Sequence, residues 1–108
     1  MSRKIGFEAE KKALEFMQEK GFILVEQNYY SRFGEIDLIM IKDKTIHFVE
    51  VKSGEGEPIY NITPKKLSKI IKTSEFYLNQ KKLDMDYCFD AVVVKDSKIE
   101  LIENITFY

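Results

Sequence analysis

The fold is decided by the stretch Gly-Glu-Ile-Asp-Leu-Ile-Met-Ile-Lys, residues 34–42, and by Ile-His-Phe-Val-Glu-Val, residues 46–51. Both runs are apolar at consecutive positions, which predicts central strands covered on both faces. Between them, residues 42–45 read Lys-Asp-Lys-Thr and predict a hairpin turn, although Asp-Lys is a weaker turn signal than Asp-Gly. A turn centred between residues 43 and 44 pairs positions whose numbers sum to 87. Asp37 is therefore expected opposite Glu50.

This expected pair of acids suggests a cation site. Directly opposed residues on a hairpin share a face, with Cβ atoms about 4.5–5.5 Å apart, and like charges there are destabilising. The apolar neighbours of Asp37 and Glu50 add a desolvation cost. A shared Mg²⁺ would remove both penalties, because Mg²⁺ takes carboxylate and phosphate oxygens as ligands. A register shifted by one residue would instead put the two acids on opposite faces, each paired with a lysine.

Other residues near this pair have two readings each. Lys52 lies two residues beyond Glu50 on the same face, opposite Glu35. Its ammonium can steady charge on a phosphate or orient a water, or it can form an ion pair with Glu35. A third acid could come from the first helix, where Glu10 and Glu8 are both candidates. His47 has the opposite parity to Glu50 and is expected to point away from the site.

The remaining pattern predicts two helices and three more strands. Residues 3–20 have apolar residues at helical spacing and end at Gly21, and Thr63-Pro64 is typical of a helix start. The expected elements are helices over 3–20 and 63–82, strands over 22–25, 34–42, 46–51, 89–94 and 99–105, a loop over 53–62 and a turn over 95–98. This order, α-β-β-β-α-β-β, predicts an α/β fold with a mixed central sheet flanked by helices.

Length and composition indicate one globular domain over residues 1–108. Hydrophobic residues make up 44% of the chain and the net charge is −1, so the chain can bury a core. No apolar run approaches the roughly 20 residues of a membrane span. The single cysteine, Cys88, cannot form an internal disulfide and is expected to be a packed residue, since the sequence supplies no partner base. We expect a cytoplasmic protein without membrane contact.

Positive charge is concentrated in one segment. Residues 63–82 carry six lysines and one glutamate, whereas residues 83–108 carry two lysines and six acids. If the protein binds nucleic acid, the nucleic acid is therefore expected to lie along the second helix. Lys65 and Lys69 lie opposite its apolar stripe, where most such residues are merely solvated. Arg32, which follows two tyrosines, could grip nucleic acid or belong to an ordinary sheet edge.

Residues 34–39, followed by Phe-Val-Glu-Val-Lys at 48–52, resemble the YraN family of bacterial proteins. That family is a branch of the restriction-endonuclease-like, PD-(D/E)xK nucleases and is similar to archaeal Holliday-junction resolvases. The resemblance covers nearly the whole chain. Further matching motifs are Gly6-x-x-x-Glu10, Gly21-Phe22 through Asn28, Thr63-Pro64-x-Lys66 and Phe89-Asp90. Three positions depart from the family: Ala9 replaces a Gly, an Arg is missing after Lys52, and Cys88 replaces an Arg. The missing arginines bear on phosphate affinity.

The resemblance implies a restriction-endonuclease-like core and a set of residue roles. Glu10, Asp37 and Glu50 would hold Mg²⁺, with Mn²⁺ as a substitute, and Lys52 would be the catalytic lysine. Lys66 would lie at the edge of the site. The implied function is a metal-dependent endonuclease acting on DNA, including branched DNA as in the resolvases. A homodimer would suit symmetric junction cleavage, which needs two sites.

Two other functions remain open from sequence. One is a nucleic-acid-binding module that keeps the nuclease fold without cutting, since fold likeness does not establish activity. The other is a small interaction protein without a nucleic-acid role. Metal dependence separates the nuclease from the binding module, and binding to DNA or RNA at low salt separates both from the interaction protein.

Overall fold

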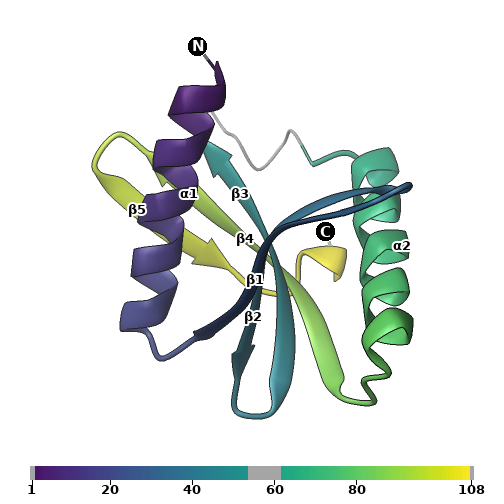
Figure 1. Cartoon of the computed structure of the whole chain (residues 1–108). Coiled ribbons are helices and arrows are strands. Elements are labelled where there is room, and N and C mark those ends of the chain that lie inside the picture. Colours follow the sequence, from purple (N-terminus) through teal and green to yellow (C-terminus); the bar gives the residue numbers. More distant parts are fainter. Residues whose placement is uncertain (1, 54–61, 108) are drawn as a thin grey trace.

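The computed structural model of the chain describes residues 2–53 and 62–107 (Figure 1). Most of the expected loop over residues 53–62 therefore lies outside the described residues. The elements in chain order are α1 (Ser2–Glu19), β1 (Ile23–Ser31), β2 (Gly34–Lys42), β3 (Thr45–Ser53), α2 (Pro64–Lys81), β4 (Asp86–Lys95), β5 (Lys98–Ile102) and the 3₁₀ helix η2 (Ile105–Phe107). This order confirms the predicted α/β fold with the succession α-β-β-β-α-β-β.

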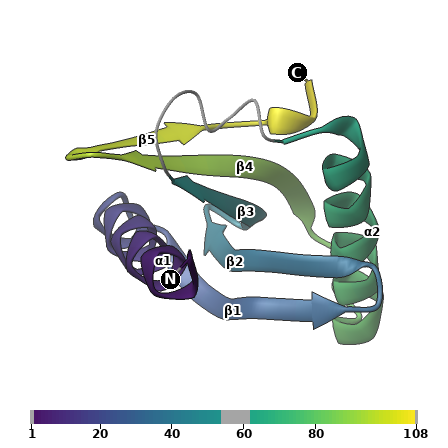
Figure 2. The same cartoon turned by 90° about the horizontal axis from the view of Figure 1, so that it is seen from above.

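The five strands form one mixed sheet in the order β1-β2-β3-β4-β5. Neighbouring strands are antiparallel except β3 and β4, which are parallel and are connected through α2. The helices lie on opposite sides of the sheet, as Figure 2 shows. Adjacent residues on β3 accordingly enter different cores: Phe48 packs in the cluster that includes Ile70 and Tyr77 of α2, and Val49 packs in the cluster that includes residues of α1.

The β2–β3 hairpin has the predicted register. Leu38 pairs with Val49, Met40 with His47 and Lys42 with Thr45, so the residue numbers sum to 87. Asp43 and Lys44 both have positive φ, 51° and 65°. Two consecutive left-handed residues make the turn type whose twist matches a two-residue hairpin. The Asp-Lys turn therefore adopts this geometry without the usual glycine.

Local sequence explains both helices. The Thr63 side chain accepts a hydrogen bond from Lys66 N at 3.2 Å, and Pro64 occupies the first turn of α2. This is the expected N-cap arrangement. In α1, Ala13 and Met17 are fully buried, and Gly21 follows the helix at a φ of 95°. The positive φ at Gly21 lets the chain turn directly into β1.

Three strands differ from the prediction by three or more residues at one end. β1 runs over nine residues instead of 22–25, because its polar second half is held by main-chain pairing with β2. β4 begins three residues earlier than predicted. β5 ends at Ile102 rather than 105: Asn104 has a φ of 57°, which ends the extended strand before η2. Among the described residues, no helix is long and apolar enough to cross a membrane.

Candidate functional site

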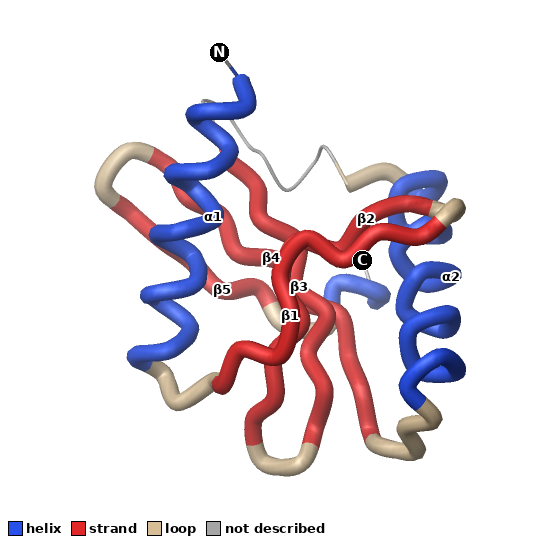
Figure 3. The backbone as a smooth tube through the Cα atoms, viewed as in Figure 1, coloured by secondary structure: helices blue, strands red, loops and turns tan. Residues whose placement is uncertain are grey.

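The site forms where β2 leaves β3. The pairing between β2 and β3 ends at Leu38 and Val49. Beyond this point β2 pairs with β1, and no other partner strand is described for it in the structure. Figure 3 shows the β1–β2 ribbon reaching towards α2. At its tip, Ser31 Oγ lies 3.1 Å from Thr73 Oγ1 of α2. Ile36 packs on the α2 side, whereas Leu38 packs on the α1 side, although residues two apart on a regular strand share a face. The strand therefore changes faces at Asp37.

Asp37 bridges the gap between the parting strands. Val51 N–H donates to Asp37 Oδ2 at 2.8 Å, and the side chains of Asp37 and Glu50 share a hydrogen bond. Burial raises the pKa of Glu50 to about 9, and the neighbouring charge of Asp37 adds to this rise. Glu50 therefore holds the proton of the pair at neutral pH and donates it to Asp37. The two acids predicted to face each other are together, and the shifted register is wrong.

The pKa of Asp37 is also raised, mainly by burial, but three contacts oppose the rise. They are the Val51 N–H, the Glu50 side chain and the charge of Lys52. Lys52 also lowers the pKa of Glu50. These opposing effects show that the Lys52 ammonium acts on both carboxyls, so the predicted Asp, Glu and Lys lie in one electrostatic environment.

A small cavity opens beside Glu50. Its volume is about 130 Å³, and its charged lining residues are Glu35, Glu50, Lys52, Lys66 and Lys69. Lys66 was expected at the edge of the site, and it does line this cavity. Lys69 was expected on a solvated face, yet it lines the cavity as well, because the β1–β2 tip brings Gly34 against it. The three ammonium groups and two carboxyl groups form a site suited to both a cation and a phosphate.

Glu10 approaches the pair from α1. Its pKa is raised by partial burial first, then by the charges of Asp37 and Glu35. Asn28 fixes this arrangement: its amide nitrogen donates to Glu10 Oε1 at 3.0 Å and to Glu35 Oε2 at 2.9 Å, with the amide oriented by these partners. Glu8, the alternative third acid, is exposed. Sequence reasoning missed Asn28, and it placed Glu35 only opposite Lys52, as a possible ion-pair partner.

Two predicted contacts lie elsewhere. Lys65 is exposed on α2 and is absent from the lining of the cavity. Arg32, in the turn between β1 and β2, places its guanidinium 5.0 Å from the centre of the Phe33 ring. Neither residue lines the cavity.

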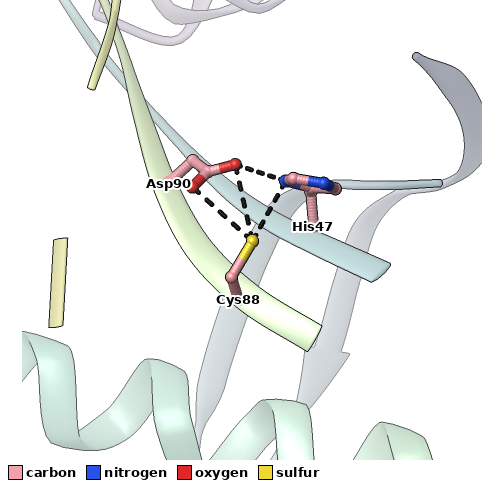
Figure 4. Close-up of side chains that lie close together, drawn as sticks. All are labelled: His47, Cys88 and Asp90. Carbon is pink, nitrogen blue, oxygen red and sulfur yellow. Dashed lines mark hydrogen bonds and ion pairs between the residues drawn. The ribbon is translucent and has the colours of Figure 1, made fainter. Parts of the chain in front are cut away.

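A second cluster lies on β3 and β4. In the part of the chain that the structure describes, one set of three potential metal ligands lies within 4.8 Å of one another: His47, Cys88 and Asp90. Figure 4 shows these side chains converging. The cluster can hold a metal ion. The carboxylate oxygens of Glu10, Asp37 and Glu50 do not form a group this close. The expectation that Cys88 has no partner base is wrong, because His47 Nδ1 lies 3.1 Å from its Sγ. His47 and Cys88 meet through the parallel pairing of β3 with β4, a register that the sequence pattern does not predict.

Comparison with known proteins gives one family. The model of a family described as "Uncharacterised protein family UPF0102" matches residues 9–94. A UPF0102 protein of Helicobacter pylori strain HPAG1 is 55% identical over 103 residues, which is 94% of this chain and 90% of the relative. Relatives from Helicobacter hepaticus and Wolinella succinogenes are 52% and 50% identical, over 97% and 98% of this chain and 96% and 99% of their own lengths. The matched range contains every residue of both clusters.

Proposed function

Because the chain belongs to the UPF0102 family, the YraN family that its motifs resemble, we propose that it is a metal-dependent endonuclease that hydrolyses phosphodiesters in DNA. The observation that carries this proposal is the buried contact between Asp37 and Glu50, next to Lys52, at a cavity rimmed by lysines. Buried acids with strongly perturbed pKa values beside a cation are typical of catalytic sites.

The residues present fit a divalent cation. Asp37 and Glu50 share one proton, and a cation that takes the place of this proton relieves the repulsion between the two ionised groups. All the donors are carboxylate oxygens, which are the ligands that Mg²⁺ prefers and that Mn²⁺ also accepts. Glu10, held by Asn28 on the α1 side, supplies a third acid. We therefore assign Glu10, Asp37 and Glu50 as the Mg²⁺ ligands.

Each charged group then has a role in hydrolysis. Bound Mg²⁺ supplies Lewis-acid activation of the phosphodiester and of the attacking water. Lys52 donates to the phosphate and stabilises the negative charge that grows on its oxygens. Lys66 and Lys69 bind phosphates at the mouth of the cavity, where they fix the register of the strand without reading its sequence. Glu50 loses its proton to solvent when the cation enters.

The substrate follows from the shape and charge of this region. Three lysine ammonium groups line the cavity and suit a phosphate, so we propose that recognition is by the nucleic-acid backbone. The adjoining lysines of α2, including Lys65, extend the positive surface beyond the cavity. We propose duplex DNA and branched DNA as substrates, the latter because of the likeness to junction resolvases. A homodimer would place two such sites on one junction.

The test is a cleavage assay on a four-way junction and on the matching linear duplex, with and without Mg²⁺. Wild type should cut only with Mg²⁺ or Mn²⁺, and Lys52→Met should lose at least about 100-fold in rate. Lys72→Met, an exposed change of the same type on α2, is the matched control.

Other outcomes assign the alternatives. Salt-sensitive DNA binding that ignores Mg²⁺ and survives Asp37→Asn, without cutting, would make the protein a binding module. Absence of DNA and RNA binding at low salt would favour an interaction protein. Either result contradicts the nuclease proposal.

A further inference from the structure

The cluster of His47, Cys88 and Asp90 is separate from the carboxylate site. His47 and Glu50 lie on opposite faces of β3, because their positions differ in parity. Asp90 is fully buried, and the His47 side chain is 11% exposed. His47 Nδ1 lies 2.6 Å from Asp90 Oδ2, and Asn104 N–H donates to Asp90 Oδ1 at 3.1 Å. The cluster is therefore a built polar site inside the sheet.

The geometry does not suit a catalytic relay. In a relay, the imidazole contacts the nucleophile through one ring nitrogen and the orienting acid through the other. Here Cys88 Sγ, at 3.1 Å, and Asp90 Oδ2, at 2.6 Å, both approach the same nitrogen, His47 Nδ1 (Figure 4). This geometry excludes a relay in which His47 activates Cys88 as a nucleophile.

Convergence on one point is instead what a metal ion requires. The three candidate atoms are a thiol sulfur, an imidazole nitrogen and a carboxylate oxygen, and they lie within 4.8 Å of one another. A divalent ion that binds sulfur deprotonates a coordinating thiol, so Cys88 can serve as a thiolate ligand beside His47 and Asp90.

We propose that His47 Nδ1, Cys88 Sγ and Asp90 form a zinc-binding site on the α1 side of β3 and β4. Zinc suits a mixed sulfur, nitrogen and oxygen set, whereas Mg²⁺ avoids thiolate. On binding, the S–H bond of Cys88 breaks, its proton passes to solvent, and the sulfur lone pair coordinates the ion. Cys88 is partly exposed, which leaves the fourth position of the tetrahedron open to water.

The observed spacing needs only small adjustments. Zinc bonds of about 2.0–2.3 Å at tetrahedral angles separate nitrogen from oxygen by about 3.3 Å, and sulfur from either by about 3.6 Å. The present distances are 2.6 Å for His47 Nδ1 to Asp90 Oδ2, 3.1 Å for Cys88 Sγ to His47 Nδ1, and 4.0 Å for Cys88 Sγ to Asp90 Oδ2. Each changes by less than about 1 Å, which side-chain rotation supplies.

The test is a Co²⁺ titration of the untagged, reduced protein, followed by competition with Zn²⁺. The chain has one cysteine and one histidine, so a thiolate-to-cobalt absorption band can come from Cys88 alone. We expect the thiolate band to saturate at one thiolate-bound Co²⁺ per chain, the band to be displaced by Zn²⁺, and the melting temperature to rise on addition of Zn²⁺. Cys88→Ser and His47→Gln should each raise the Zn²⁺ dissociation constant at least about tenfold.

Matched variants separate this site from the carboxylate site. Asp37→Asn and Glu50→Gln should leave the cobalt band, and its displacement by Zn²⁺, unchanged. Thermal unfolding of metal-free Cys88→Ser should match wild type, which shows that the variant folds. Absence of the band, unchanged Zn²⁺ affinity in Cys88→Ser, or one ion per two chains would overturn the proposal, and none of these results depends on DNA cleavage.

Discussion

Asp37 Oδ2 accepts the main-chain N–H of Val51 at 2.8 Å, in the place where a neighbouring strand would supply a carbonyl. β2 has turned away from β3 at this point, so the N–H would otherwise be a buried donor without its strand partner. An unsatisfied buried donor costs about 1–3 kcal/mol. The same carboxyl contacts Glu50, and the charge of Lys52 lowers its pKa. The Asp37 side chain thus provides the acceptor for a main-chain donor of β3 and is also one member of the acidic pair.

Substitutions at Asp37 should separate these two roles. Asp37→Asn keeps an oxygen that can accept the Val51 N–H, so its free energy of unfolding should stay close to wild type. Asp37→Ala should lower the free energy of unfolding by about 1–3 kcal/mol, because the donor loses its partner. Both should abolish metal-dependent cleavage. Urea denaturation and the cleavage assay measure the two effects, and full cleavage by Asp37→Asn would contradict the role in metal binding.

Stability should depend on pH through Glu50. Its pKa is about 9 in the folded chain and 4.5 as an ordinary glutamate, so between these values the folded state holds more protons than the unfolded state. The free energy of unfolding must then fall as pH rises through this window. In metal-free buffer, wild type should be more stable at pH 5 than at pH 8.

Glu50→Gln is the variant that tests this dependence. At pH 8 it should exceed wild type in free energy of unfolding by at least about 1.4 kcal/mol, the equivalent of one pKa unit. Between pH 5 and pH 8 the free energy of unfolding of this variant should also fall much less than that of wild type. Glu100→Gln, an exposed change on β5, is the control and should keep the wild-type profile. Equal profiles for Glu50→Gln and wild type would show that Glu50 is ionised throughout.

Asn28 should control the position of the Glu10 carboxylate, the third acid of the site. It has a φ of 51° and links Glu10 to Glu35 through its amide. Asn28→Gly keeps the left-handed backbone without strain but releases Glu10, so Mn²⁺ affinity should fall while the fold persists. Asn28→Ala should lose the same affinity and about 1 kcal/mol of stability, because alanine is strained at positive φ. Isothermal calorimetry with Mn²⁺ and thermal unfolding distinguish the two, and unchanged affinity in both variants would remove Glu10 from the site.

The lysines of α2 should fall into two groups. Lys66 and Lys69 line the cavity, whereas Lys72 is exposed and outside its lining. Lys66→Met and Lys69→Met should each weaken DNA binding and reduce the slope of log affinity against log salt by about 1, the release of one counterion. Lys72→Met should change neither quantity as much. Filter binding at several salt concentrations measures the slope, and equal effects of all three changes would indicate nonspecific attraction.

The central hairpin could be predicted because its information is local. Consecutive apolar residues and one short turn define its register, and Asp37 and Glu50 follow the last pair of that register, where their side chains meet. The edge strand β1 was mostly missed, since its polar half is held by backbone pairing and leaves no apolar pattern. Asn28 joined the site only through this strand, so its role was invisible.

Contacts between segments distant in the chain could not be predicted from the sequence either. Lys69 enters the cavity because the β1–β2 tip lies against α2, a packing that helical spacing alone does not encode. His47 and Cys88 meet through the parallel register of β3 and β4, two strands separated by a whole helix. Parallel registers depend on the length and docking of the crossover, whereas a hairpin register depends on its turn.

Mn²⁺ binding by Cys88→Ser, compared with the same protein carrying Asp37→Asn and Glu50→Gln, tests the assignment of the acidic pair most directly. The cysteine change removes the thiolate of the second cluster, so the remaining high-affinity site is the one at the parting of β2 and β3. We predict one Mn²⁺ per chain, with proton release from Glu50, and loss of this binding in the triple variant. Equal Mn²⁺ binding by the two proteins would contradict it.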